Sequence, residues 1–251
     1  MRQDVKFDFK NKNYIVVGAS SGIGKRVTEE ILIEGGTVLA VARDYERLSS
    51  IFSGSKKIYT KSVDVRDRTQ LEAEIYQFVL DHGKFHGSIY TAGISKTTLL
   101  NSFSQEVATE IMDINFWGWI NLMKIINKKK YSVDGCSNVV VASVAAYTGE
   151  AGNFAYSASK SALLTSVKTF AKEIYRRSNR VNSVSPGFIK SPMSDGFFDE
   201  RGFSDKVKEK HLLGLGEPED VSGLILYLLS ERARWITGSD FVIDGGYLVS
   251  N

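Results

Sequence analysis

Three residues near the middle of the chain have the types and spacing needed for acid–base chemistry on a carbonyl group. Tyr156 and Lys160 lie four positions apart, and Ser143 ends an apolar run upstream of them. On a helix, residues four apart project from one face, so the hydroxyl and the ammonium can share a small volume. A nearby cation favours phenolate, so Lys160 is expected to lower the tyrosine pKa from about 10 toward the working pH. Tyr156 is therefore a candidate general acid or base.

The elements that must position these residues alternate between short β-branched runs and longer amphipathic segments. A tyrosine and a lysine four apart also occur by chance on solvated helices, so their interpretation depends on this frame. The alternation predicts one α/β domain, residues 1–251, with a doubly wound, seven-stranded parallel sheet covered by helices on both faces. Strands are expected at 14–17, 37–41, 58–63, 88–91, 138–142, 181–184 and 240–243, and helices at 23–34, 45–52, 69–82, 105–127, 156–177 and 218–229.

The longest irregular stretch covers about residues 187–216. A segment of that length inside a compact domain is typical of a lid or a binding loop, so we interpret it as the substrate loop. In a doubly wound sheet, ligands bind beyond the carboxyl ends of the strands, which is where this loop begins.

Composition and charge exclude several other classes of protein. The net charge of +3 is spread out, and the run Lys128 to Lys130 resembles a solvated helix end, so no nucleic-acid partner is expected. The single cysteine, Cys136, cannot form an intrachain disulfide, which suits a reducing cytosol. No signal-peptide core or membrane-length apolar run is present, so we expect a soluble cytoplasmic protein without a membrane partner. His82, His86 and His211 are too dispersed to predict a metal site.

A glycine-rich turn follows the first predicted strand and leads into a helix. Gly18 permits a tight turn, Gly22 lets the backbone approach a pyrophosphate, and Gly24 allows close packing of the helix on the strand. Unpaired N–H groups at the helix N-terminus favour an anion. A purely structural turn is the alternative, but the position in an alternating pattern favours a Rossmann-type dinucleotide site. The candidate cofactor-binding residues here are Gly18, Ser20, Ser21, Gly22, Ile23 and Gly24.

The end of the second predicted strand indicates which dinucleotide is bound. An acidic residue there would bind a ribose 2′-hydroxyl, whereas an arginine accommodates a 2′-phosphate. If the strand covers 37–41, Ala42 occupies the acidic position and Arg43 follows, so NADP(H) is favoured and NAD(H) remains possible. Asp44 is expected to cap the next helix. Asp64 and Val65 end the third strand, where the carboxylate could accept from the adenine amino group or cap a helix.

These motifs together resemble the short-chain dehydrogenase/reductase family. The resemblance spans nearly the whole chain, and its C-terminal part is similar to the branch that contains 3-oxoacyl-[acyl-carrier-protein] reductases and many sugar or polyol dehydrogenases. It is carried by Gly18-x-x-x-Gly22-Ile23-Gly24, Ala92-Gly93, Asn115, Ser143, Tyr156-x-x-x-Lys160, Pro186-Gly187, Gly216-Glu217-Pro218-Glu219-Asp220-Val221, Thr237-Gly238 and Asp244-Gly245-Gly246.

The resemblance implies roles for four catalytic residues. Tyr156 would protonate the carbonyl oxygen while hydride arrives from the nicotinamide, and Ser143 would hydrogen-bond that oxygen. Lys160 would bind the nicotinamide ribose and lower the Tyr156 pKa. Asn115 would hold a water that connects Lys160 to solvent, although a buried amide in an apolar segment needs partners in any case.

The resemblance also implies further contacts and an assembly. Ala92, Gly93, Pro186, Gly187, Ile189 and Ser191 would complete the cofactor site. A homotetramer, or a homodimer, would form through the helices 105–127 and 156–177 and the C-terminal segment 244–251.

Three departures from the family pattern affect the cofactor edge of the sheet. Val17 stands where the family has threonine, Tyr90-Thr91 replaces Asn-Asn, and Ser191 replaces threonine. The first two changes remove polar groups that tie neighbouring strands together. We expect Thr91 to restore part of that bonding.

The function predicted from the sequence is NADPH-dependent reduction of a ketone or a 3-oxoacyl thioester to a secondary alcohol. An NAD(P)-dependent sugar or polyol dehydrogenase is an alternative, and a non-catalytic dinucleotide-binding regulatory protein is another. Aromatic and apolar residues in the lid favour a hydrophobic or acyl substrate, but they could equally pack on the cofactor or on a neighbouring subunit. They are Phe188, Met193, Phe197, Phe198 and Phe203.

Overall fold

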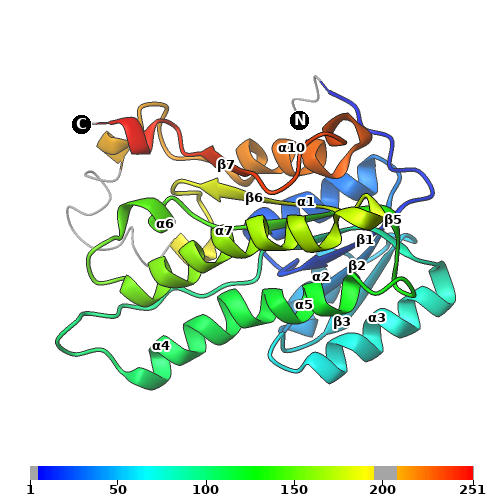
Figure 1. Ribbon diagram of the computed structural model, residues 1–251, viewed down its shortest axis with the longest axis horizontal. Coiled ribbons are helices and arrows are strands. Elements are labelled where there is room, and N and C mark those ends of the chain that lie inside the picture. Colours follow the sequence, from blue (N-terminus) through cyan, green and yellow to red (C-terminus); the bar gives the residue numbers. More distant parts are fainter. Residues whose placement is uncertain (1–4, 195–207, 251) are drawn as a thin grey trace.

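A parallel sheet of seven strands forms the centre of the protein, as seen in a computed structural model that describes residues 5–194 and 208–250 (Figure 1). The strand order is β3-β2-β1-β4-β5-β6-β7, so the direction of winding reverses between β1 and β4. This reversal is the point at which doubly wound proteins bind ligands. The strands are β1 (Asn13–Val17), β2 (Thr37–Ala42), β3 (Ile58–Ser62), β4 (Phe85–Tyr90), β5 (Ser132–Val141), β6 (Arg180–Pro186) and β7 (Asp240–Ile243).

Helices cover both faces of the sheet and bury two separate apolar layers. Successive residues of a strand point to opposite faces, so Ile15 and Val17 join one layer while Tyr14 and Val16 join the other. Figure 1 shows α1 and α10 along one side of the sheet and α3, α5 and α7 along the other. The α-helices are α1 (Gly22–Ile33), α2 (Tyr45–Ile51), α3 (Arg68–His82), α4 (Gln105–Met112), α5 (Gly118–Ile126), α6 (Ala145–Thr148), α7 (Phe154–Ile174) and α10 (Pro218–Leu229).

Short polar side chains fix where several of these helices begin. The Asp44 carboxylate accepts from the Arg47 backbone N–H at 3.0 Å, which confirms its predicted role as the cap of α2. Asp67 caps α3 in the same way, by accepting from Gln70 at 2.9 Å. Asp64 is therefore not the cap of α3, and that alternative is wrong.

The predicted fold class is confirmed, but the predicted continuous helix at 105–127 is wrong. The segment divides into α4, a π-helix at Asp113–Trp117, and α5. Within the π-helix, the Gly118 N–H donates to the Asp113 carbonyl, five residues back. Apolar periodicity averages over several turns and does not reveal one wide turn.

The two ends of the predicted lid are joined by backbone hydrogen bonds. The Lys190 N–H donates to the Gly216 carbonyl at 2.9 Å, and the Gly216 N–H donates to the Phe188 carbonyl at 3.1 Å. Residues 195–207, with Phe197, Phe198 and Phe203, lie outside the described residues.

The described residues contain neither a candidate membrane span nor a candidate metal centre. Among them, no helix combines the length and the apolar composition needed to cross a bilayer. The same ranges, 5–194 and 208–250, contain no cluster of three or more His, Cys, Asp or Glu residues placed to bind a metal ion.

Candidate active site

One cavity of about 600 Å³ opens at the carboxyl edge of the sheet, beside the reversal between β1 and β4. Segments that follow β1 to β6 contribute to its wall, because all these strands are parallel and end at the same edge. The predicted site residues that line it are Gly18, Ser20, Ser21, Gly22, Ile23, Gly24, Arg43, Val65, Ala92, Gly93, Ser143, Tyr156, Lys160, Pro186, Gly187, Ile189 and Ser191. Of the other two predicted residues, Asp64 flanks this wall in sequence and Asn115 is fully buried.

The glycine-rich turn forms the floor of the cavity between β1 and α1. Gly18 has a φ of +94°, a conformation that favours glycine, and a Cβ there would lie 2.5 Å from the Thr91 hydroxyl oxygen. A Cβ on Gly24 would lie 2.2 Å from the Gly18 carbonyl oxygen, so the start of α1 packs directly on the turn. Ser21 precedes α1 without a side-chain capping bond. This geometry suits a pyrophosphate at the helix N-terminus.

Thr91 ties the ends of two strands together at this floor. Its hydroxyl lies 3.0 Å from the Val17 carbonyl and 3.2 Å from the Gly18 carbonyl, within donating distance of both. The expectation that Thr91 supplies part of the bonding between the two strands therefore agrees with these contacts. At position 17 the acceptor is the backbone carbonyl, so this contact does not depend on the side chain there.

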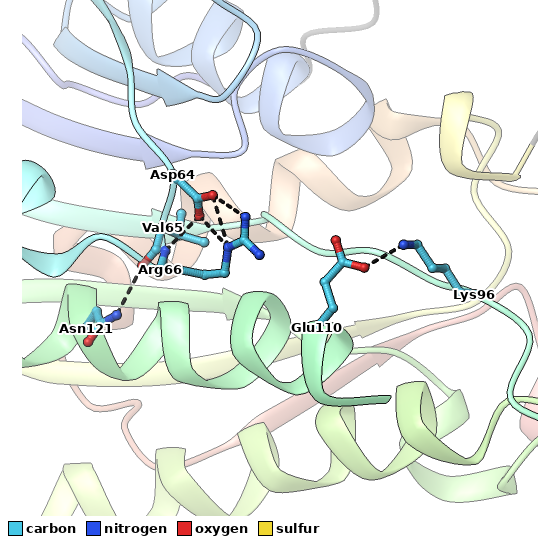
Figure 2. Close-up of polar contacts among 6 residues, drawn as sticks. All are labelled: Asp64, Val65, Arg66, Lys96, Glu110 and Asn121. Atoms are coloured by element: carbon cyan, nitrogen blue, oxygen red, sulfur yellow. Dashed lines mark hydrogen bonds and ion pairs between the residues drawn. The ribbon is translucent and has the colours of Figure 1, made fainter. Parts of the chain in front are cut away.

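One arginine lines the cavity after β2, and a second lies beside it in the segment after β3. Arg43 lines the wall immediately after β2, which extends to Ala42. Asp64 is held by Arg66, whose Nε lies 3.0 Å from both carboxylate oxygens (Figure 2). This hydrogen bond lowers the pKa of Asp64, so the carboxylate is ionised at neutral pH. Sequence analysis did not identify Arg66 as the partner of Asp64. Its position two residues after Asp64 is the feature that could have indicated the pair.

Ser143, Tyr156 and Lys160 face one another on another wall. Ser143 directly follows the strand end Val141-Ala142, and α7 carries the other two one turn apart. The Lys160 Nζ lies 5.6 Å from the centre of the Tyr156 ring and donates to the Val141 carbonyl at 2.8 Å. The Ser143 hydroxyl oxygen accepts from the Ala145 N–H at 3.1 Å, which fixes its rotamer.

Burial controls the ionisation of this group. The pKa of Tyr156 is raised because the phenol is buried, and the hydrogen bond with Ser143 opposes this effect only partly. The predicted lowering of the Tyr156 pKa by Lys160 is therefore wrong for the protein without ligand. Burial also lowers the pKa of Lys160 to about 8, since the ammonium has left water. Burial is the largest cause of both shifts, and it depends on the complete fold, so the spacing of the two residues in the sequence does not reveal it.

Asn115 lies behind this wall and connects two segments. Its Oδ1 accepts from the Ile94 N–H at 2.8 Å, and its Nδ2 donates to the Ile94 carbonyl and to the Ser159 hydroxyl, both at 3.0 Å. Ser159 in turn donates to the Tyr156 carbonyl at 2.7 Å. The amide is thus a satisfied buried group that holds the loop after β4 against the tyrosine's helix. Ser159 was missed, although it directly precedes Lys160.

A carboxylate also lines the cavity, on the loop after α6. Glu150 Oε1 accepts from the Thr148 hydroxyl at 2.9 Å and from the Tyr247 hydroxyl at 2.6 Å. Ser95, Thr97 and Asn153 line the same cavity, so part of its wall is polar. No periodic pattern or motif in the sequence indicates Glu150, because its neighbour Tyr247 is 97 positions away.

Comparisons with known proteins agree with this geometry. A family model described as Enoyl-(Acyl carrier protein) reductase matches residues 18–248. A 3-oxoacyl-[acyl-carrier-protein] reductase from Thermotoga maritima is 31% identical over 244 residues, covering 96% of this chain and 99% of that protein. Carbonyl reductase family member 4 from Xenopus laevis is 31% identical over 232 residues, covering 92% and 95%. A crystal structure from Brucella melitensis, titled a short-chain dehydrogenase/reductase and glucose/ribitol dehydrogenase, has a TM-score of 0.91 at 28% identity, covering 97% and 99%.

The fold and the cavity define a dinucleotide-binding oxidoreductase, and these matches extend over nearly the entire chain. The chain belongs to the short-chain dehydrogenase/reductase family. It is accordingly an NAD(P)-dependent enzyme that acts on CH–OH or C=O groups.

The buried ammonium predicts a specific dependence of stability on pH. In the unfolded chain the Lys160 pKa is about 10.4, so between pH 8 and that value the unfolded state binds more protons than the folded state. Raising the pH across this range therefore stabilises the fold. The free energy of unfolding of the ligand-free wild type, minus that of Lys160→Met, should rise by roughly 2 kcal/mol from pH 8 to pH 10. Urea unfolding of both proteins at each pH measures this difference in the free energy of unfolding. A difference that does not change with pH would contradict a Lys160 pKa of about 8.

Proposed function

We propose that the protein is an NADPH-dependent carbonyl reductase that converts a ketone or a 3-oxoacyl group to a secondary alcohol. The observation that carries the proposal is the position of Ser143, Tyr156 and Lys160 on the same cavity as the glycine-rich turn. A dinucleotide held at that turn and a carbonyl held at Tyr156 would therefore share one enclosed volume. Proximity of this kind supplies much of the catalysis in two-substrate reactions.

The residues present fit a dinucleotide along the whole cavity. The turn after β1 would hold the pyrophosphate, and Val65 with the loop after β4 would form the walls around the adenosine half. Pro186, Gly187 and Ile189 would border the nicotinamide, and Lys160 would hydrogen-bond its ribose. When bound, the reduced nicotinamide supplies the hydride to the carbonyl carbon.

The protein's own groups would supply the proton and bind the developing charge. Ser143 and Tyr156 would both donate hydrogen bonds to the carbonyl oxygen, and Tyr156 would transfer its proton to that oxygen as the negative charge develops. A raised pKa keeps Tyr156 protonated at neutral pH, which is the form that reduction needs. Lys160, one turn away, would stabilise the phenolate left behind until it is reprotonated.

The preference for NADP rests on the end of β2. Ala42 ends the strand, so no carboxylate follows directly to bind a ribose 2′-hydroxyl, and Arg43 lines the cavity at the next position. Asp44, the nearest acid, is engaged in capping α2. An exposed guanidinium is well suited to bind a 2′-phosphate through charge-assisted hydrogen bonds.

A ketone or acyl substrate is supported by the apolar side of the cavity. Phe188 and Met193 line it, at the start of the predicted lid 187–216. The similarity to a 3-oxoacyl-[acyl-carrier-protein] reductase and to a carbonyl reductase, described above, supports the same substrate class.

A hydroxylated ketone, such as a sugar or polyol oxidation product, is the second candidate substrate. The Glu150 carboxylate, together with Ser95, Thr97 and Asn153, would accept and donate hydrogen bonds to hydroxyl groups. One Glu150 oxygen is engaged by two hydroxyl donors, which holds the carboxylate at the wall.

Self-association into a homotetramer or homodimer is also part of the proposal. Trp117, 52% exposed beside α5, and Tyr175, 60% exposed at the end of α7, leave aromatic surface on the two predicted interface helices. Trp119 is fully buried and belongs to the core instead. Burial of these two side chains against a second subunit would remove exposed apolar surface from water.

Tyr156→Phe should separate chemistry from binding. Loss of the hydroxyl removes the proton donor, so turnover of ketones with NADPH should fall at least about 100-fold. NADPH binding, followed by its fluorescence, should change less than about twofold. Tyr175→Phe, at the exposed end of the same helix, is the matched control and should retain activity. Undiminished turnover in Tyr156→Phe would exclude the mechanism, and NADPH binding without any turnover in the wild type would favour a regulatory binding protein.

Arg43→Ala should discriminate between the two cofactors. Because only NADPH carries the 2′-phosphate, its dissociation constant should rise by about tenfold or more, while that of NADH changes little. Titration calorimetry with both dinucleotides gives the ratio of the two dissociation constants, for the wild type and for the variant. Arg47→Ala, on the exposed surface of α2, controls for the loss of a positive charge nearby. Equal weakening of both cofactors would remove the basis for the NADP preference.

Glu150→Gln should reveal which substrate class uses the polar wall. If hydroxylated ketones bind the carboxylate, kcat/KM for a ketose should fall roughly tenfold, while a simple aliphatic 3-oxo ester loses little. Glu173→Gln, on the exposed face of α7, is the charge-matched control. A uniform effect on both substrates would leave the apolar carbonyl substrate as the better assignment.

A further inference from the structure

Tyr90 contacts the turn that carries Asn115. It ends β4, is 1% exposed, and its hydroxyl donates a short hydrogen bond to the Ile114 carbonyl. Ile114 belongs to the π-helix Asp113–Trp117 and directly precedes Asn115. Burial raises the pKa of Tyr90, so this phenol is a permanently neutral donor. A buried hydroxyl without a partner costs free energy, and here the partner is a carbonyl of the wide turn.

The wide turn determines where the Asn115 amide lies. A π-turn contains one residue more than an α-turn, and each residue of a helix advances the side-chain direction by about 100°. Conversion of this turn to regular α-helix would therefore rotate Asn115 away from Ile94 and Ser159. The hydrogen bonds that hold the loop after β4 to α7 would be lost.

Gly118 provides the space that the Tyr90 hydroxyl occupies. A Cβ on Gly118 would lie 2.2 Å from that hydroxyl oxygen and 2.8 Å from the Val65 Cγ2 atom. Val65 is itself tied to α5, because the Asn121 side chain donates to its carbonyl at 3.1 Å (Figure 2). Because Tyr90 is buried and Val65 is held in this way, the absence of a side chain at Gly118 is a steric requirement of the arrangement.

We propose that Tyr90 and Gly118 act together as positioning residues, which hold the π-turn open and thereby hold Asn115 behind the catalytic wall. Neither residue lines the cavity. They act through Asn115 and Ser159 on the backbone of Tyr156. The catalytic consequence rests on the proposed reductase function, whereas the structural consequence does not.

Tyr90→Phe removes only the hydroxyl and tests the first member of the pair. The ring remains, and so does its packing against Trp119, whose ring centre lies 6.0 Å from that of Tyr90. We expect kcat for ketone reduction to fall about tenfold, KM and NADPH affinity to change less than twofold, and the solvent isotope effect on kcat to increase as proton delivery slows. Tyr14→Phe, an equally buried tyrosine in the apolar layer on the other face of the sheet, is the control and should change none of these.

Hydrogen exchange of the segment 113–117, measured without ligand, gives a readout that does not depend on activity. Exchange should accelerate at least tenfold in Tyr90→Phe and stay unchanged in Tyr14→Phe. If exchange accelerates but kcat is unaffected, the positioning role is overturned. If the wild type reduces no carbonyl compound, the proposed function fails, and the exchange result still decides whether Tyr90 holds the turn.

Combination with Gly118→Ala tests whether the two residues act as one unit. In the wild-type background, the added methyl meets the hydroxyl, so exchange of the segment 113–117 should accelerate at least tenfold. In the Tyr90→Phe background the contact with the hydroxyl is gone and only the weaker contact with the Val65 side chain remains, so the further acceleration should be less than about threefold. Multiplicative effects of the two substitutions would show that the residues are independent and would overturn the proposal.

Discussion

The parallel direction of all seven strands is the constraint on which the rest of this structure depends. Because β1 to β6 end at one edge, the loops that follow them lie side by side, although they are distant in the sequence. The glycine-rich turn, Arg43, Ser143 and the segment after Pro186 reach one cavity for this reason. The reversal of winding between β1 and β4 then separates the loops enough to leave a crevice instead of a packed surface.

Residues whose role depends on chain direction and local spacing could be predicted from the sequence. The seven strands, the glycine-rich turn and the Tyr156–Lys160 pair are of this kind, since each follows from a short pattern. Arrangements that depend on burial or on a distant neighbour could not be predicted from the sequence. The raised pKa of Tyr156 reflects desolvation by the complete fold. The π-turn inside the predicted helix 105–127 reflects contacts with β4 that the periodicity of the helix itself does not contain.

The electrostatics of the site are consistent with reduction. Lys160 is 5% exposed, and its Nζ donates to a backbone carbonyl at 2.8 Å. A cation in that position is destabilised in the ligand-free protein, which is why its pKa falls to about 8. Hydroxyl groups of a ribose would give the ammonium polar partners, so cofactor binding and the charged form of Lys160 should favour each other. The raised pKa keeps Tyr156 neutral, which is the form that the proposed reduction would need.

The departures at Tyr90 and Thr91 show how a family motif can change while the physical requirements it meets are kept. The cofactor edge needs β1 tied to β4, and Thr91 supplies that tie with one hydroxyl directed at the β1 carbonyls. Position 90 is then free for a large side chain, provided that its polar end finds an acceptor. The Ile114 carbonyl in the π-turn is that acceptor, and the chain has a glycine at 118, where a Cβ would collide with the phenol. The substitution at position 90 is thus matched by Gly118, and only the folded structure shows that the two residues belong together.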